Sequence, residues 1–202
     1  MTSAAPGDTR SVRPNAITLA MRLSAVAALV GADLASKSVV FAWLGKRPPE
    51  MTFDLHGHQR YAIAGDWFAF MLSWNPGMAW GFDKLPPWLL VGGRVAAVAF
   101  LTWLVVRQTR AKRWLTIALV LILAGALGNL YDNLFMPPRV DGATFGSVRD
   151  FIDVYFSFWD WHFPTFNVAD SCITVGAVLL FASSFLTPRE DGSASATSAA
   201  LR

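Results

Sequence analysis

Four stretches of the chain are long, apolar and nearly free of charge. Residues 114–131 and 171–188 contain no charged side chain. Residues 16–44 are apolar except at three ionisable positions, and residues 85–106 except at one. An 18-residue helix is about 27 Å long, close to the roughly 30 Å hydrocarbon core of a bilayer. The pattern therefore predicts an all-α membrane protein with four transmembrane helices.

Two long connections between these segments, residues 45–84 and 132–165, have patterns of their own. Residues 51–74 hold short β-favouring runs interrupted by glycine, which predict a small sheet on the membrane surface. Residues 151–163 are dense in Phe, Tyr and Trp, which favour the membrane–water interface. We therefore expect this second stretch to lie in the headgroup layer.

Basic residues indicate how the segments are oriented. The short link at 107–113 carries four basic residues and no acid, whereas the two long connections are balanced or acidic. The positive-inside rule then places this link and both termini in the cytoplasm. We expect one membrane domain over residues 16–187, with outer loops 45–84 and 132–165. The tails, 1–15 and 188–202, are expected to be disordered.

Composition narrows the possible classes of protein. Hydrophobic residues make up 54% and charged residues 15% of the 202 positions, against roughly 25% charged in a soluble domain. With Cys172 as its single cysteine, the chain is no disulfide scaffold, and its hydrophobicity excludes a disordered chain. The net charge of +3 is explained by basic loops beside a membrane, so no nucleic-acid partner is expected.

Ionisable groups in the predicted spans gather at one depth. Each such group costs roughly 2.5–3.5 kcal/mol on insertion scales and so indicates function. With the orientation above, Asp33, Asp132, Asp150 and Asp170 come from four segments and meet near the outer membrane surface. Lys37 follows Asp33 by four positions and shares its helix face.

Each of these features also has a plainer interpretation. Asp33 and Lys37 are also consistent with an ion pair that only holds the helix in place and takes no part in chemistry. Asn75-Pro76-Gly77 is typical of a turn. Small residues around 125–128 favour close helix packing. Taken singly, Asp150 reads as a loop acid and Asp170 as a charge at a helix N-terminus. Their common depth makes a paired site the better interpretation.

The residues that other kinds of site require are absent from the sequence or lie apart in it. The chain has no H-E-x-x-H motif, and its histidines, His56, His58 and His162, lie in the outer connections, so we expect no metal. Arg94 is expected to snorkel outward or to meet an acid. Two other classes use the same observations: a small transporter or ion-coupled channel, and a lipid-binding scaffold. Inverted repeats or broken helices would favour the transporter, and the sequence shows neither.

Five motifs in order resemble a known family. They are Asp33-x-x-x-Lys37, Asn75-x-Gly77, Gly128-Asn129-Leu130-Tyr131-Asp132, Val148-x-Asp150-Phe151-Ile152 and Phe166-Asn167-Val168-Ala169-Asp170-Ser171. Together they look like lipoprotein signal peptidase, the bacterial type II signal peptidase, over residues 16–186. Any one motif is weak, but all five in this order are highly specific.

The resemblance implies an intramembrane aspartyl protease of the bacterial inner membrane, with four transmembrane helices, an extracytoplasmic β-cradle and an interfacial helix. Such an enzyme cuts prolipoproteins just before a lipid-modified cysteine, near the periplasmic face. Its catalytic pair matches Asp150 and Asp170. Residues matching the supporting or substrate-binding positions are Asp33, Lys37, Asn75, Gly77, Gly128, Asn129, Asp132 and Asn167. The implied partners are the prolipoprotein and membrane lipids, with no cofactor and a monomeric enzyme.

The chain departs from the family pattern at two places. The family usually has Arg after the acid that matches Asp132, and this chain has Asn133. We expect a substrate-contacting guanidinium to be missing there or to be replaced by Arg139 or Arg149. Residues 78–82 also differ from the family's usual small residues and Phe, which affects the expected shape of the substrate groove.

Overall fold

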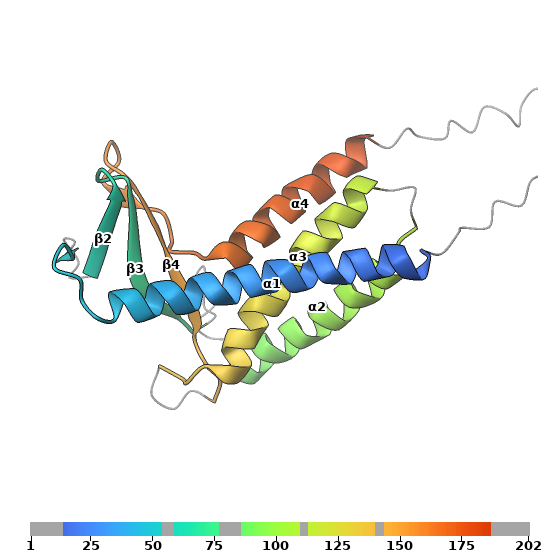
Figure 1. The fold of residues 1–202 in the computed structure, drawn as a ribbon, viewed down its shortest axis with the longest axis horizontal. Coiled ribbons are helices and arrows are strands. Elements are labelled where there is room, and N and C mark those ends of the chain that lie inside the picture. The colour runs from blue at the N-terminus through green and yellow to red at the C-terminus, as the bar shows by residue number, and fades with distance from the viewer. Residues whose placement is uncertain (1–13, 54–58, 77–85, 110–112, 140–143, 187–202) are drawn as a thin grey trace, which may run out of the picture.

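The protein is described by a computed structural model over residues 14–53, 59–76, 86–109, 113–139 and 144–186. Within these ranges its helices are α1 (Ala16–Leu44), α2 (Pro87–Arg107), α3 (Arg113–Phe135) and α4 (Val168–Leu186). Its strands are β1 (Thr52–Phe53), β2 (Gln59–Ala64), β3 (Phe68–Asn75), β4 (Val148–Phe156) and β5 (Trp161–His162). The helices form a bundle, and the strands gather at one end of it (Figure 1). The first turn of α1 and the last turn of α4 lie at the opposite end.

All four predicted apolar segments are helical. In the described residues α1, α2 and α3 are long and apolar enough to cross a membrane, and α4 contributes a shorter apolar stretch, Val168–Ser183. The molecule therefore has the helices of a membrane protein, while a fourth membrane crossing stays a prediction. Helix α3 continues past the predicted end at 131, and α4 begins before the predicted start at 171. These extensions place Asp132 and Asp170 inside helices.

The strands form one antiparallel sheet in the order β1-β2-β3-β4-β5. The small sheet expected within residues 51–74 is confirmed by β1, β2 and β3. Strand β4 was expected to be a loop. It forms because it pairs with β3, from Phe68 opposite Val154 to Asn75 opposite Val148. This partner lies far away in sequence, so the local pattern of acids and aromatics does not reveal the strand.

The aromatic stretch at 151–163 forms the end of β4, a turn and β5, and its expected place in the headgroup layer stays a prediction. No helix other than α1–α4 occurs in the described residues, so the expected interfacial helix has no counterpart there. Backbone pairing of β4 with β3 and β5 satisfies the N–H and C=O groups that a helix would otherwise satisfy internally.

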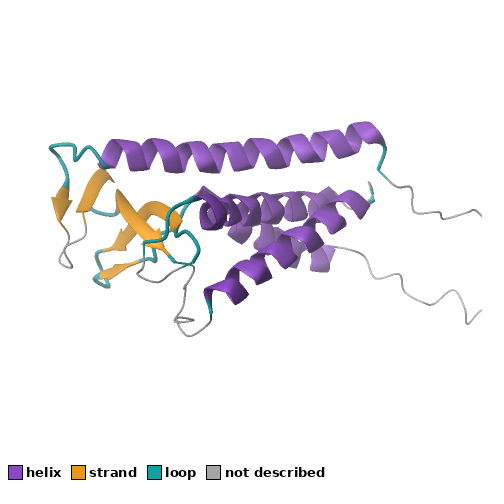
Figure 2. Ribbon diagram, turned by 90° about the horizontal axis from the view of Figure 1, so that it is seen from below, coloured by secondary structure: helices purple, strands orange, loops and turns teal. Residues whose placement is uncertain are grey.

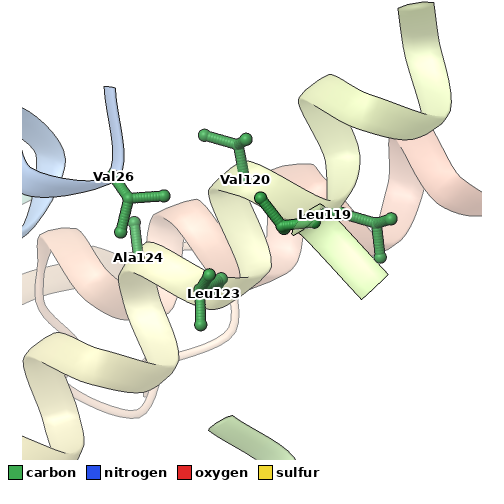
Figure 3. Packing of buried hydrophobic residues seen from close by; sticks show 6 residues of the cluster. Val26, Leu119, Val120, Leu123 and Ala124 are labelled. Carbon is green, nitrogen blue, oxygen red and sulfur yellow. The ribbon is translucent and has the colours of Figure 1, made fainter. Parts of the chain in front are cut away.

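Helix α3 is the centre of the bundle and packs against each of the other three helices. Six buried apolar residues form the core where α1, α2 and α3 meet (Figure 3): Val26, Val105, Leu119, Val120, Leu123 and Ala124. Many large apolar side chains on the outer helix faces stay exposed, such as Phe100, Trp103, Phe181 and Phe185. Such an outward-facing apolar surface fits a lipid environment.

One ionisable residue of the predicted spans has a structural role. Arg22 is buried in α1, and its guanidinium donates to the carbonyl oxygens of Val105 at 2.9 Å and Gln108 at 2.7 Å. The last carbonyls of a helix have no partner within the helix, and a cation there is favourable. Arg22 therefore fastens α1 to the C-terminal end of α2, far from the sheet.

Helix α1 also reaches the sheet (Figure 2). Its 29 residues extend about 43 Å, well beyond a hydrocarbon core of about 30 Å. Its last turns bring Val40 and Leu44 into a second apolar cluster with Phe151 of β4. This contact holds the sheet against the helices and thereby positions β4 beside the ends of α3 and α4.

Candidate active site

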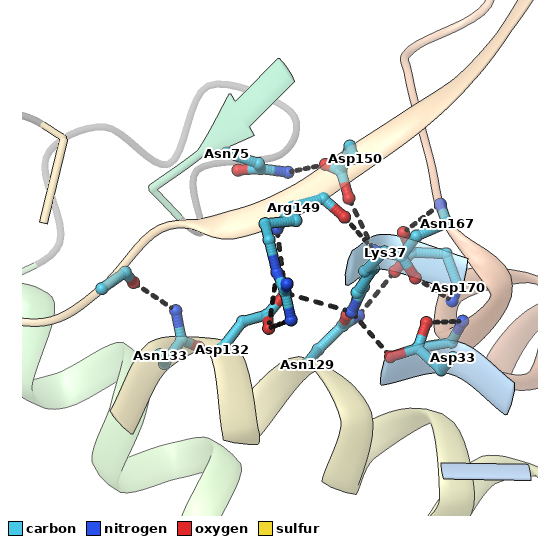
Figure 4. Close-up of polar contacts among 12 residues, drawn as sticks. Asp33, Lys37, Asn75, Asn129, Asp132, Asn133, Arg149, Asp150, Asn167 and Asp170 are labelled. Atoms are coloured by element: carbon cyan, nitrogen blue, oxygen red, sulfur yellow. Dashed lines mark hydrogen bonds and ion pairs between the residues drawn. The ribbon is translucent and has the colours of Figure 1, made fainter. Parts of the chain in front are cut away.

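Polar side chains from α1, α3, α4, β3 and β4 converge at the sheet end of the bundle (Figure 4). The four acids expected to share one depth, Asp33, Asp132, Asp150 and Asp170, all lie in this cluster. Asp33, Asp132 and Asp150 are almost fully buried. Buried charges are tolerated only when they are paired and hydrogen-bonded, so the contacts of each acid offset the free-energy cost of burying it.

Lys37 is the fully buried cation at the centre of one half of the cluster. Its ammonium group lies 2.8 Å from Asp33 Oδ2 and 3.2 Å from Asp132 Oδ2, and it donates to Asn129 Oδ1 at 2.9 Å. An ammonium has three donors, and all three are used. The pair expected from the spacing of Asp33 and Lys37 is therefore present, and it joins α1 to α3.

Asp132 has a second cation. The guanidinium of Arg149 lies 2.8 Å from Asp132 Oδ1, and the backbone N–H of Arg149 donates to Oδ2 at 3.0 Å. Arg149 also donates to Ser38 Oγ at 3.2 Å. Arg139 lies over the ring of Trp74 at 4.3 Å. Arg149, one of the two arginines expected to compensate for Asn133, is thus committed to tying β4 to α3.

Asp33 also binds the start of α4. Its Oδ1 accepts the backbone N–H of Ala169 at 2.9 Å, one of the first N–H groups of the helix. This contact needs a glycine in α3, because a Cβ at Gly128 would lie 2.5 Å from Asp33 Oδ2. The sequence Gly128-Asn129 therefore serves both packing and polar contact, two interpretations that the sequence left as alternatives.

Asn167 connects the two acids that the motifs mark as a pair. Its Nδ2 donates to Asp150 Oδ1 at 2.6 Å, and its backbone N–H donates to Asp170 Oδ2 at 3.1 Å. In return, Asn167 Oδ1 accepts the N–H of Asp170 at 2.9 Å, which caps the N-terminus of α4. Asn129 Nδ2 donates to Asp170 Oδ1 at 2.7 Å. The same contacts that start the helix therefore fix Asp170 in place.

The other side of Asp150 is held by β3. Asn75 Nδ2 donates to Asp150 Oδ2 at 3.1 Å. Asn75 is the last residue of β3 and pairs with Val148 of β4. The sheet register thus sets the Asn75–Asp150 contact. Gly77, which belongs to the same motif, lies outside the described residues.

The surroundings of Asp150 change its acidity. Burial and the nearby charge of Asp170 raise the pKa of Asp150 to about 7, although hydrogen bonds from Asn75 and Asn167 and the charge of Lys37 oppose the rise. Two carboxyl groups close together cannot both ionise cheaply. Near neutral pH, Asp150 therefore holds a proton for much of the time.

Both acids line a pocket of about 680 Å³. Asn75 and Trp74 of β3 lie on one side of it, and Phe166 and Thr174 on another. The pocket is large enough for several residues of an extended peptide. The arrangement thus places two carboxyl groups, one of them with a raised pKa, beside a space for a substrate, which suits general acid–base chemistry.

Comparison with known proteins identifies the family. The family model for signal peptidase (SPase) II matches residues 25–186. This chain belongs to the signal peptidase II family. Proteins named lipoprotein signal peptidase include one from Pseudomonas fluorescens strain Pf-5, 40% identical over 133 residues, which cover 63% of this chain and 71% of that protein. Another, from Yersinia pseudotuberculosis, is 34% identical over 161 residues, 78% of this chain and 82% of that protein.

Solved structures share the fold. A bacterial membrane enzyme determined in meso at 2.3 Å resolution matches with a TM-score of 0.62 and 22% identity, over 83% of this chain and 88% of that one. A second, at 1.9 Å resolution, matches with a TM-score of 0.61 and 21% identity, over 84% of this chain and 95% of that one. The resemblance inferred from the five motifs is therefore confirmed at the level of family and fold.

Several ionisable groups of this signal peptidase II family member lie apart from the pair. Asp153 contacts Arg60 Nε at 2.6 Å and His162 Nδ1 at 2.8 Å, so it belongs to the sheet. His56 and His58 lie outside the described residues. Within the described ranges no three His, Cys, Asp or Glu side chains are grouped as metal ligands would be.

Sequence reasoning assigned no role to Arg94, and the structure gives it a partner beside the site. Its guanidinium donates to Asn133 Oδ1, and Asn133 Nδ2 donates to Gly146 O at 2.8 Å. The only sequence signal was a lone arginine in an apolar helix. Cys172 is buried in α4.

Proposed function

We propose that this protein removes the signal peptide from lipid-modified prolipoproteins by cutting just before the diacylglyceryl-cysteine, with Asp150 and Asp170 as an aspartic catalytic pair. The observation that carries the proposal is that Asn167 holds both acids beside one pocket. Membership of the signal peptidase II family and the names of the relatives support a substrate of this class.

The mechanism assigns the two acids opposite roles. Asp170 is the base and takes a proton from a water molecule while the water oxygen attacks the scissile carbonyl carbon. Asp150, protonated near neutral pH, donates its proton to the carbonyl oxygen. When the tetrahedral intermediate collapses, the C–N bond breaks, the leaving amine takes a proton from Asp170, and Asp150 recovers one from the hydroxyl that becomes the carboxyl group. Each acid then returns to its starting state.

The supporting residues keep this assignment fixed. Asn129 and the Asn167 backbone donate N–H groups to Asp170, and such donors stabilise an ionised carboxylate. The Lys37 ammonium can only donate, so the Asn129 atom that it contacts is the side-chain oxygen Oδ1. The amide nitrogen of Asn129 therefore faces Asp170. The oxygen and nitrogen of Asn129 are thus oriented by a charge rather than by packing alone.

The proposed arrangement in the membrane has four crossing helices, both termini in the cytoplasm and the acid pair near the outer face. The end of α2 at Arg107 and the start of α3 at Arg113, two of the basic residues of this stretch, lie at the end of the bundle opposite the sheet, which supports this orientation. The sheet then lies on the outer surface, and the pocket is at the depth of a cysteine whose diacylglyceryl chains are in the outer leaflet. We propose that the enzyme acts as a monomer of the bacterial inner membrane.

The test is cleavage of a lipidated preprolipoprotein by the purified full-length protein, followed by mass analysis of both products. We expect a mature product that begins at the modified cysteine, and no cleavage of the unlipidated precursor. Asp150→Asn and Asp170→Asn should each lose at least about 10²-fold in rate. Asp153→Asn is the matched control, because Asp153 is a buried acid of the same strand that contacts Arg60 and His162 instead. Full activity of Asp170→Asn would remove the aspartic mechanism.

A further inference from the structure

Arg94 is the charged residue of α2 that lies nearest the acid pair. It is half-buried, and its guanidinium donates to the side-chain oxygen of Asn133. Within the described part of the chain this is the one hydrogen bond that Arg94 makes. Arg22 and Arg149, by contrast, each have at least two oxygen acceptors. The other N–H groups of Arg94 donate to no acceptor in the described part of the chain.

Asn133 is fixed from its other side. Its Nδ2 donates to Gly146 O at 2.8 Å, so its Oδ1 is turned toward Arg94. Asn133 is buried and follows Asp132 in α3, which places the Asn133 side chain beside the polar cluster (Figure 4). Arg94 also interacts electrostatically with Asp170 and Asp150. The guanidinium is thus held at the edge of the site by a neutral partner.

A cation in this position needs further acceptors. An arginine within a membrane helix is costly, and an amide oxygen satisfies one of its five donors. The planar guanidinium fits a carboxylate with two parallel hydrogen bonds. Peptide hydrolysis creates such a carboxylate at the new C-terminus of the released signal peptide, next to the acid pair.

We propose that Arg94, oriented by Asn133, binds the cleaved end of the signal peptide: the carbonyl oxygen at the scissile bond before hydrolysis and the new carboxylate after it. The inference rests on the proposed function, since it assumes that a signal peptide occupies the pocket. Arg94 is then a substrate-binding residue, supplied by α2. Binding strengthens when the carbonyl becomes a carboxylate, so release of the product depends on this contact.

The experiment compares two synthetic signal peptides as inhibitors of the full-length protein in detergent. The peptides end at the residue before the cysteine and differ only in a C-terminal carboxylate or carboxamide. In Arg94→Gln, the carboxylate peptide should lose about tenfold or more in affinity relative to the carboxamide peptide, because a charged hydrogen bond is removed. Arg94→Lys keeps the charge but not the two parallel N–H donors of the guanidinium, so it should show a smaller selective loss of affinity for the carboxylate peptide.

Arg22→Gln is the control for damage to helix packing, because Arg22 bridges α1 and α2 at the far end. It should leave the ratio of the two affinities unchanged. If Arg94→Gln and Arg94→Lys also leave this ratio unchanged, Arg94 is structural and the inference is wrong. Should Arg94→Gln fail to fold, Arg94→Lys decides by the same ratio. A wild-type protein that cleaves no prolipoprotein would instead refute the proposed function.

Discussion

Lys37 is the residue whose loss should disturb the cluster most. Lys37→Met keeps a long unbranched side chain but removes the positive charge between Asp33 and Asp132. Asp132 keeps Arg149 as a second cation, whereas the remaining donor to the Asp33 carboxylate within the described residues is the N–H of Ala169. Breaking a buried pair by removing one partner costs about 3–5 kcal/mol. At about 2–4 °C for each kcal/mol, the melting temperature should fall by about 6–20 °C.

The assay is thermal unfolding in detergent of Lys37→Met, Asp33→Asn and the double variant. The double variant should be more stable than Lys37→Met alone, because it removes the uncompensated carboxylate together with the cation. Lys46→Met is the matched control, since Lys46 is exposed just beyond α1 and should change stability by less than about 0.5 kcal/mol. Losses that simply add in the double variant would refute the view that Lys37 compensates Asp33.

Three other changes test separate contacts. Gly128→Ala places a Cβ against Asp33 and should destabilise the fold by about 1–3 kcal/mol in the same unfolding assay. Arg22→Leu leaves the last carbonyls of α2 without their donor and should lower the melting temperature without changing KM. The raised pKa of Asp150 predicts that a pH–rate profile falls above about pH 7, as its proton is lost. By the same linkage, the stability that protonated Asp150 contributes at low pH is lost as pH rises toward 7.

The sequence was sufficient for the elements whose signal is local. Long apolar runs predict the helices, and the short β-favouring runs of 51–74 predict a small sheet, which β1, β2 and β3 form. Strand β4 was not predictable in this way, because Asp150 and Asp153 interrupt its apolar pattern and its partner β3 is distant in sequence. Both acids are buried in the folded protein, where Asn75, Asn167 and Arg60 satisfy them.

The site, like the fold, was predictable where its signal is local in the sequence. The spacing of Asp33 and Lys37 identifies an ion pair because one helix turn fixes its geometry. The contacts of Arg149 with Asp132 and of Arg94 with Asn133 join different elements, and no local pattern encodes them. Their existence follows only from the packing of α2 and β4 against α3. Motif comparison found the acids, since motifs record residue type and order, but it could not find the cations that compensate them.

The charges of the cluster explain why so many ionisable groups can be buried together. Within the described residues the cluster holds four carboxyl groups and three cations, Lys37, Arg149 and Arg94, so a proton on Asp150 leaves the remaining acids and the cations matched in number. A neutral cluster avoids most of the cost of burying charge, and ionisation of Asp150 would give it a net negative charge. The proton on Asp150 is therefore favoured by burial and by the charge of Asp170, against the opposing contacts of Asn75, Asn167 and Lys37. Among the described residues Arg94 contacts one oxygen, whereas Lys37 and Arg149 each contact several, which is why we propose Arg94 as the cation that takes the new carboxylate.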